Sequence, residues 1–92
     1  MPVELRYFAT VREAIGQRTE SRDLPAGTTV RDVLATLEAE HPDLDGRLLD
    51  GGGVADSVTV MRNGTHVTHL DGVDTELADG DRLAITPPVT GG

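Results

Sequence analysis

The residues best suited to chemistry in this sequence are the last two, Gly91 and Gly92, which follow Pro87-Pro88-Val89-Thr90. The two prolines restrict φ and favour an extended spacer, whereas glycine has no side chain and does not become ordered unaided. Such a tail holds a terminal carboxylate away from the body of the protein. An ionised carboxylate is a poor electrophile, so another molecule must activate it before a nucleophile can attack. We therefore predict a domain over residues 1–86 and a flexible tail over residues 87–92.

No other motif in the sequence predicts a catalytic or metal site. The three glycines at 51–53 lack the lysine of a phosphate-binding loop, because the chain contains no lysine. His66 and His69 lie three residues apart, a spacing that in a strand points two side chains to opposite faces. The four aspartates between residues 71 and 81 do not follow the spacing of a calcium loop. We expect no catalytic residue, no metal site and no bound cofactor.

The composition narrows the class of protein. A chain of 92 residues forms one domain, and because Tyr7 and Phe8 are its only aromatic residues, the core must be aliphatic. Without cysteine, disulfides and thiolate metal sites are excluded. A net charge of −8 argues against binding to nucleic acid or an anionic membrane. No apolar run is long enough to span a membrane and no signal-peptide pattern is present, so we expect a cytoplasmic protein.

All eight basic residues are arginines. Together with abundant aspartate and threonine, this composition suits a high-salt cytoplasm. The lack of lysine also has a chemical consequence. If the chain is joined to other proteins through an amine, it can be the donor but not a lysine-linked acceptor.

Hydrophobic alternation predicts strands at residues 3–8, 19–24, 57–62, 65–69 and 82–86. The first two strands form an N-terminal hairpin whose connection contains a short helix at residues 11–15, ended by Gly16. Asn63-Gly64 is typical of a two-residue hairpin turn between the third and fourth strands. We expect a loop at residues 51–53, a turn-rich stretch at residues 70–81 and a buried Leu77.

Residues 28–40 form the clearest predicted helix. Thr29 and Asp32 predict a capping box at its start, and His41 caps its end. Its apolar residues recur at helical spacing, at Val30, Val33, Leu34 and Leu37. A further helical turn within residues 43–50 would bury Leu44, Leu48 and Leu49. One main helix packed on a mixed sheet of about four to five strands gives an α+β fold of the β-grasp type.

Alternation also predicts a partner-binding surface on the sheet face that turns away from the helix. If Val60, Leu83 and Ile85 face the helix, the opposite face carries Phe8, Met61, Ala84 and Thr86. Phe8 and Met61 would then be exposed beside Arg6 and Arg62, and an apolar centre with a polar rim is typical of an interface. Scattered exposed apolar side chains are equally normal on any protein, and a register shift of one residue would reverse the assignment.

Several segments resemble the MoaD/ThiS-type ubiquitin-like sulfur carriers, above all the small subunit of molybdopterin synthase. The resemblance covers nearly the whole chain, and its most specific motif is the ending Pro-Pro-Val-x-Gly-Gly at residues 87–92. The other segments are Leu5-Arg6-Tyr7-Phe8-Ala9, Arg12-Glu13-Ala14-Ile15-Gly16, Thr29-Val30-Arg31-Asp32-Val33-Leu34, Arg62-Asn63-Gly64 and Asp79-Gly80-Asp81. Length and composition are similar to those of the small archaeal modifier proteins in the same group. The thiazole-synthesis carriers are shorter and usually lack the paired prolines.

The resemblance implies a carrier whose working residue is Gly92. An E1-like adenylating enzyme would use ATP and Mg²⁺ to form a glycyl adenylate, which a sulfur donor would convert to a thiocarboxylate (1-thioglycine). The large subunit of molybdopterin synthase would use that sulfur to build the molybdenum cofactor. The activated terminus could also form isopeptide bonds with lysines of target proteins. Gly91 and the spacer residues Pro87, Pro88 and Val89 would contact these partners, which supply the catalysis.

Thr86 departs from the family pattern, because many relatives carry there an aromatic residue that packs on the activating enzyme. Phe8 could supply part of that contact. The alternative function is a non-covalent β-grasp interaction module that binds through Phe8 and Met61 and for which the tail is inert. Removing the tail and placing charges at Phe8 and Met61 would have opposite effects under the two hypotheses.

Overall fold

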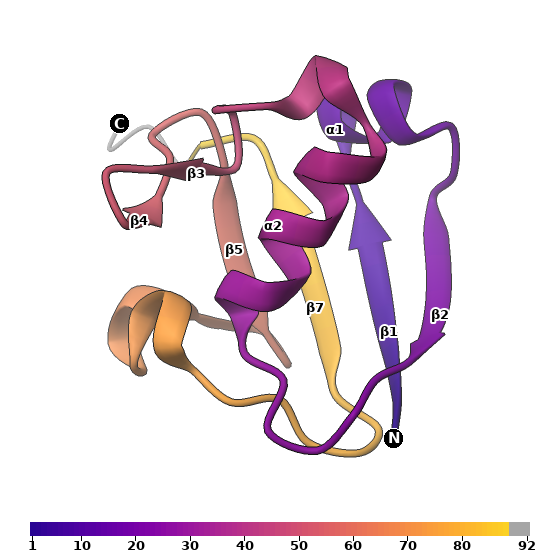
Figure 1. Ribbon diagram of the computed structural model, residues 1–92, viewed down its shortest axis with the longest axis vertical. Coiled ribbons are helices and arrows are strands. Elements are labelled where there is room, and N and C mark those ends of the chain that lie inside the picture. Colours follow the sequence, from indigo (N-terminus) through magenta and orange to yellow (C-terminus); the bar gives the residue numbers. More distant parts are fainter. Residues whose placement is uncertain (89–92) are drawn as a thin grey trace.

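The computed structural model describes residues 1–88 and shows one five-stranded mixed sheet crossed on one face by a helix (Figure 1). The strand order is β2-β1-β7-β5-β6; β1 and β7 run parallel in the middle, and the other neighbours are antiparallel. The sheet strands are β1 (Pro2–Tyr7), β2 (Thr19–Asp23), β5 (Thr59–Arg62), β6 (Thr65–His66) and β7 (Arg82–Thr86), and the helices are α1 (Ala9–Ile15) and α2 (Val30–Glu40). The predicted α+β, β-grasp architecture is confirmed.

The core lies between α2 and the near face of the sheet. All four residues of the predicted apolar stripe of α2 are buried, and Leu34 and Leu37 are fully so. The three central strands β1, β7 and β5 contribute the alternating residues Val3, Leu5, Tyr7, Val60, Leu83 and Ile85. Complete burial of an aliphatic side chain stabilises a domain by about 1.5–3 kcal/mol, so this layer is the main source of stability. The register expected from alternation is confirmed.

The residues predicted to cap the two ends of α2 do so in the structure. Thr29 Oγ1 accepts a hydrogen bond from the Asp32 N–H at 3.3 Å, and Asp32 Oδ2 accepts one from the Thr29 N–H at 3.0 Å. This reciprocal capping box satisfies two backbone donors that the first turn leaves open. His41 forms the C-cap, and its N–H donates to the Leu37 carbonyl at 2.9 Å.

The N-terminal hairpin is present, with α1 in its connection. Gly16 ends α1 with a φ of 86°, and its N–H donates to the Arg12 carbonyl at 2.7 Å. Tyr7 links the two strands of the hairpin, because its hydroxyl, on β1, donates to Glu20 Oε1 on the edge strand β2 at 2.7 Å. Burial and this hydrogen bond raise the pKa of Tyr7 well above its ordinary value. The hydroxyl therefore stays protonated and keeps donating across the neutral range.

The segment after the Asn63-Gly64 turn differs from the prediction. Positive φ values of 51° and 84° at the two turn residues confirm the tight hairpin. The return strand β6, however, ends at His66, and the chain continues as the 3₁₀ turns η2 (Val67–His69) and η3 (Gly72–Asp74). A strand through residue 69 was therefore the wrong expectation. The turns bury Val67 and Val73, which a straight edge strand would carry away from the core.

The segment between α2 and β5 also has more structure than predicted. The expected helical turn is the 3₁₀ turn η1 (Pro42–Leu44), and Leu44 and Leu48 are buried as expected, whereas Leu49 is half-buried. The glycine-rich stretch forms a tight turn between two short strands, β3 (Leu49–Asp50) and β4 (Gly53–Val54). Among residues 1–88, no helix is both long and apolar enough to cross a bilayer.

Candidate functional site

The sheet face opposite α2 carries the predicted partner-binding residues. Arg6 on β1, Ala84 on β7 and Met61 on β5 are direct cross-strand neighbours, so their side chains form one row on this face. Phe8 lies at the end of β1 and is 43% exposed. These residues line a hollow of about 290 Å³, which is bounded by Arg6, Phe8, Met61, Asn63, Gly64, Arg82 and Ala84.

Phe8 is directed outward by the backbone around it. Tyr7 points into the core, and the extended conformation of Phe8 continues the alternation. Ala9 then has a φ of 52°, a left-handed conformation that is uncommon outside glycine and turns the chain from β1 into α1. The Phe8 N–H donates to the Ile85 carbonyl at 3.2 Å. Phe8 is therefore attached to β7 one residue before that strand ends.

The end of β7 lies beside this exposed aromatic. Thr86 is half-buried, and its hydroxyl donates to the Thr59 carbonyl at 3.4 Å and to the Pro87 carbonyl at 3.1 Å. Pro87 and Pro88 are exposed at the point where the chain leaves the sheet. The predictions for Val89, Gly91 and Gly92 lie outside the described residues. The structure thus brings Pro87 and Pro88 near the Phe8 surface, by which we mean the exposed sheet face around Phe8, Met61 and Ala84.

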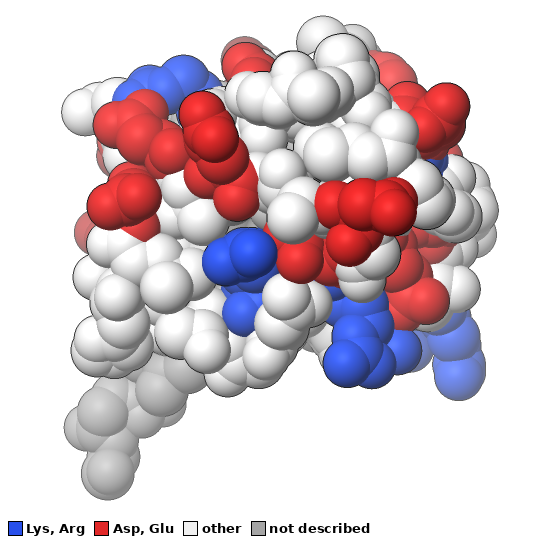
Figure 2. All heavy atoms as spheres, turned by 90° about the horizontal axis from the view of Figure 1, so that it is seen from below, with Lys and Arg blue, Asp and Glu red and all other residues white. Residues whose placement is uncertain are grey.

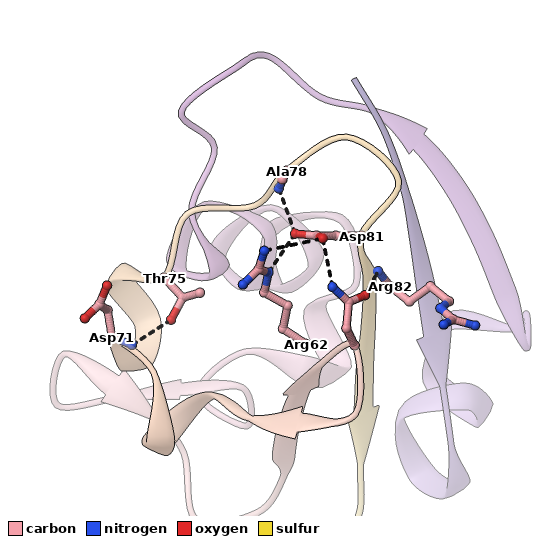
Figure 3. A network of polar contacts seen from close by, with 7 residues as sticks. Arg62, Asp71, Thr75, Ala78, Asp81 and Arg82 are labelled. Carbon is pink, nitrogen blue, oxygen red and sulfur yellow. Dashed lines mark hydrogen bonds and ion pairs between the residues drawn. The ribbon is translucent and has the colours of Figure 1, made fainter.

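Arg62 does not lie beside Phe8 and Met61, contrary to the expectation from sequence. Its Nε donates to Asp81 Oδ2 at 2.7 Å in an ion pair at the start of β7 (Figure 3). Asp81 is only 5% exposed and also accepts hydrogen bonds from Asn63 Nδ2 at 2.9 Å and the Ala78 N–H at 2.7 Å. Burial acts to raise the pKa of Asp81, but the hydrogen bonds from Arg62, Ala78 and Asn63 outweigh it and hold that pKa below its ordinary value.

Arg82 takes the place expected for Arg62. Its side chain points away from the Asp81 network in Figure 3, and it lines the hollow with Phe8 and Met61. The signal for this exchange was in the sequence. Arg62 shares its parity with inward-facing Val60, whereas Arg82 shares its parity with outward-facing Ala84.

The two histidines lie closer together than expected. Because β6 ends at His66, His69 belongs to a 3₁₀ turn, and the two ring centroids are 6.0 Å apart in an edge-to-face arrangement. His66 Nδ1 accepts from the Thr68 N–H at 3.4 Å. Within residues 1–88, no group of three or more His, Cys, Asp or Glu side chains is arranged to hold a metal ion.

Comparisons with known proteins establish the family of this chain. A model of the ThiS family matches residues 5–92. The chain belongs to the ThiS family. The Haloferax volcanii small archaeal modifier protein 3 is 49% identical over 92 residues, which cover both chains completely. The molybdopterin synthase sulfur carrier subunit of Chlamydomonas reinhardtii is 34% identical over 92 residues, again covering both chains completely.

Solved structures of relatives have the same fold as this chain. The solution structure of the Haloferax volcanii HVO 2177 protein superposes with a TM-score of 0.89 at 49% identity, covering 100% of this chain and 87% of that one. The Amycolatopsis orientalis BexX/CysO complex contains a chain that superposes with a TM-score of 0.77 at 26% identity, covering 98% and 99% of the two chains. The relatives match the predicted class of sulfur carriers and protein modifiers, and that complex shows such a structure crystallised with a partner protein.

Proposed function

We propose that this chain is a ubiquitin-like sulfur carrier and protein modifier that is activated at Gly92. The observation that carries the proposal is the position at which the chain leaves β7, at Pro87 and Pro88. β7 ends beside Phe8, so a partner bound to the exposed sheet face meets the chain where it leads toward Gly91 and Gly92. The similarity to sulfur carrier subunits and small archaeal modifier proteins supports the same function.

The chemistry begins with activation of the carboxylate. A carboxylate oxygen of Gly92 attacks the α-phosphate of ATP in an E1-like enzyme that binds Mg²⁺, and pyrophosphate leaves. Hydrosulfide (HS⁻) then attacks the carbonyl carbon of the acyl adenylate and AMP leaves, which yields the thiocarboxylate with no change in the oxidation state of sulfur. Attack by a lysine amine instead gives an isopeptide bond. Glycine suits both reactions because no Cβ crowds the carbonyl that is attacked.

The body of the protein serves as a docking domain in this proposal. The partners are the E1-like adenylating enzyme, the large subunit of a molybdopterin synthase and, for conjugation, lysines of target proteins. The two enzymes supply the catalytic groups, and a target lysine supplies the nucleophile that attacks the same tail. The cofactors ATP and Mg²⁺ belong to the activating enzyme, and the chain itself acts as its substrate.

The test compares the tail with the docking surface. Removal of Gly92 should abolish ATP-pyrophosphate exchange by the cognate E1-like enzyme while thermal unfolding stays unchanged, because the buried core described above is formed by residues up to Ile85. Phe8→Asp with Met61→Asp should weaken binding to that enzyme and leave the fold intact. If the chain without Gly92 is activated normally, the carrier function is wrong. The alternative, a non-covalent interaction module, predicts the opposite pattern. In that case the Phe8→Asp/Met61→Asp variant would lose cellular function, and the chain without Gly92 would keep it.

Intact-mass measurement of the protein purified from its source organism separates the two uses of the terminus. An oxygen-to-sulfur exchange at Gly92 indicates a sulfur carrier. Gly-Gly remnants on lysines of other proteins after digestion indicate a modifier. A terminus that carries neither modification under any growth condition argues against both.

A further inference from the structure

The arginines of this acidic protein fall into two groups. Half of them are neutralised within the domain, through the ion pairs Arg6–Glu4, Arg22–Glu20 and Glu40, Arg31–Asp74 and Arg62–Asp81. The other half make no side-chain hydrogen bond or ion pair with any residue between 1 and 88, and these are Arg12, Arg18, Arg47 and Arg82. In a chain with 16 acidic residues, four arginines without such a partner need a reason.

Three of these four arginines surround Phe8. Arg82 lines the hollow between Phe8 and Met61. Arg12 and Arg18 line a second hollow of about 250 Å³ on the other side of the aromatic ring, together with Arg6 and Phe8. The two hollows share Arg6 and Phe8, so they form one continuous surface. We define this arginine ring as Arg6, Arg12, Arg18 and Arg82.

The ring contrasts with the charge of the whole molecule. Figure 2, which views the molecule from below, shows acidic side chains over much of the upper half and basic side chains mainly in the lower half. Glu4 lies near the ring and is already paired with Arg6. Arg12, Arg18 and Arg82 come from α1, from the residue before β2 and from β7, so only the fold brings them together. Their placement around the most exposed large apolar side chain among residues 1–88 gives an interface with a cationic rim.

We propose that the protein that docks on the Phe8 surface presents a pocket for the aromatic ring within a rim of aspartates and glutamates. This inference rests on the proposed function and adds the chemistry of the partner's surface. An arginine guanidinium can donate two parallel hydrogen bonds to one carboxylate, which fixes orientation as well as adding affinity. Contacts on both sides of Phe8 prevent the bound domain from rotating about the aromatic anchor. The end of β7, and with it the spacer, is thereby held at one position on the partner.

The ring also resolves an electrostatic conflict. A domain of charge −8 repels an acidic partner at long range, and a partner with a carboxylate rim is repelled everywhere except at the ring. Complementary charges at the contact and repulsion elsewhere favour a single docking orientation. The three arginines of the ring that have no ion pair within residues 1–88, Arg12, Arg18 and Arg82, thus select the face that docks, in addition to supplying affinity.

Binding to the E1-like enzyme of the source organism tests the proposal, measured with the full chain by calorimetry without ATP. The variant R12Q/R18Q/R82Q should bind about tenfold or more weakly than the wild type, because three charge-assisted contacts are lost. Arg47→Gln is the matched control, since Arg47 has no ion pair within residues 1–88 and lines a separate hollow with Glu13 and Asp43. The control should bind within about twofold of the wild type.

The salt dependence of the dissociation constant separates charge from shape. Wild-type binding should weaken as KCl rises, and the triple glutamine variant should lose most of that dependence. Phe8→Ala should weaken binding and leave the salt dependence as it is in the wild type. R12K/R18K/R82K keeps the charge but not the forked donors, and should bind between the wild type and the glutamine variant.

Wild-type affinity and salt dependence in the glutamine variant would overturn the proposal. Thermal unfolding of each variant checks the fold, and no change is expected because Arg18 and Arg82 are exposed and Arg12 is half-buried. The chain without Gly92 should bind with wild-type affinity yet not be adenylated. The docking proposal can therefore be wrong while the proposal of activation at Gly92 is right, and the reverse result is equally distinguishable.

Discussion

Asp81 holds the start of β7 to the β5–β6 hairpin, and its environment makes a buried charge tolerable. The carboxylate accepts from Arg62, Asn63 and the Ala78 N–H, so its desolvation is offset by hydrogen bonds from both neighbouring segments (Figure 3). The backbone N–H of Arg82 in turn donates to Asn63 Oδ1 at 2.9 Å. The network keeps Arg62 away from the docking surface and sets the position of Arg82 within it.

Asp81→Asn should destabilise the protein by about 2–3 kcal/mol, because charge-assisted hydrogen bonds are lost and the new amide N–H₂ faces other donors. The control is Asp79→Asn, an exposed residue in the same turn, which should change stability by less than about 0.5 kcal/mol. Chemical denaturation monitored by circular dichroism measures both. Equal stabilities of the two variants would show that the network contributes little.

The lowered pKa of Asp81 also predicts an acid dependence of stability. The folded state holds the ionised form more strongly than the unfolded chain does, so the stabilisation is complete above the unfolded pKa of about 4. It is lost as the pH falls through that value toward the lower folded pKa. The free energy of unfolding should therefore drop below about pH 4, and Asp81→Asn should remove part of that drop. Superimposable pH profiles of wild type and variant would contradict the assignment.

Among the elements, the β5–β6 hairpin depends on its two-residue turn. Gly64 has a φ of 84°, a conformation that costs a residue with a Cβ about 1–2 kcal/mol. Gly64→Ala should destabilise the protein by that amount. Gly53→Ala is the matched control, because Gly53 is not in the left-handed region and its Cβ would enter open space. Thermal unfolding measures the stability of both variants. Similar losses of stability would indicate that the effect comes from backbone entropy and not from the geometry of the turn.

Helix α2 depends on its capping box in the same local way. Thr29→Ala should cost about 1 kcal/mol, because it removes the acceptor for the Asp32 N–H. Thr36→Ala provides the control, since Thr36 is exposed in the middle of the same helix and alanine has the higher helix propensity. The control should be neutral or slightly stabilising in denaturant titrations. A similar loss of stability in both variants would show that the effect of Thr29→Ala does not come from the capping hydrogen bond.

For the whole molecule, the net charge of −8 implies self-repulsion in the compact state. Raising KCl from about 0.1 M to about 1 M shortens the Debye length from about 10 Å to about 3 Å. The melting temperature should therefore rise with KCl, and differential scanning calorimetry measures the change. A melting temperature that is constant or falls with KCl would show that the internal ion pairs outweigh the repulsion.

Several parts of this protein depend only on neighbouring residues and were therefore predictable from the sequence. Strand alternation, the helical spacing in α2, the Thr29–Asp32 capping box and the Asn63-Gly64 turn are all set within a few residues of backbone, so they could be read in order. The Gly91-Gly92 ending is likewise a local motif and needs no tertiary contact to suggest its chemistry. Phe8 was placed on the correct face for the same reason.

Which charged side chains are neutralised and which are available depends on contacts between distant parts of the chain. An arginine side chain is long and flexible enough to reach several carboxylates, so the partner of Arg62 depends on where residue 81 lies after the chain has returned through two 3₁₀ turns. The same return ends β6 at His66 and buries Val67 and Val73 in the two 3₁₀ turns that follow. The arginine ring combines residues from α1, β1, β7 and the residue before β2, and no sequence spacing encodes their proximity. In the proposed function, the tail motif specifies the group that is transferred, and the fold places the exposed Phe8 face where a partner would dock.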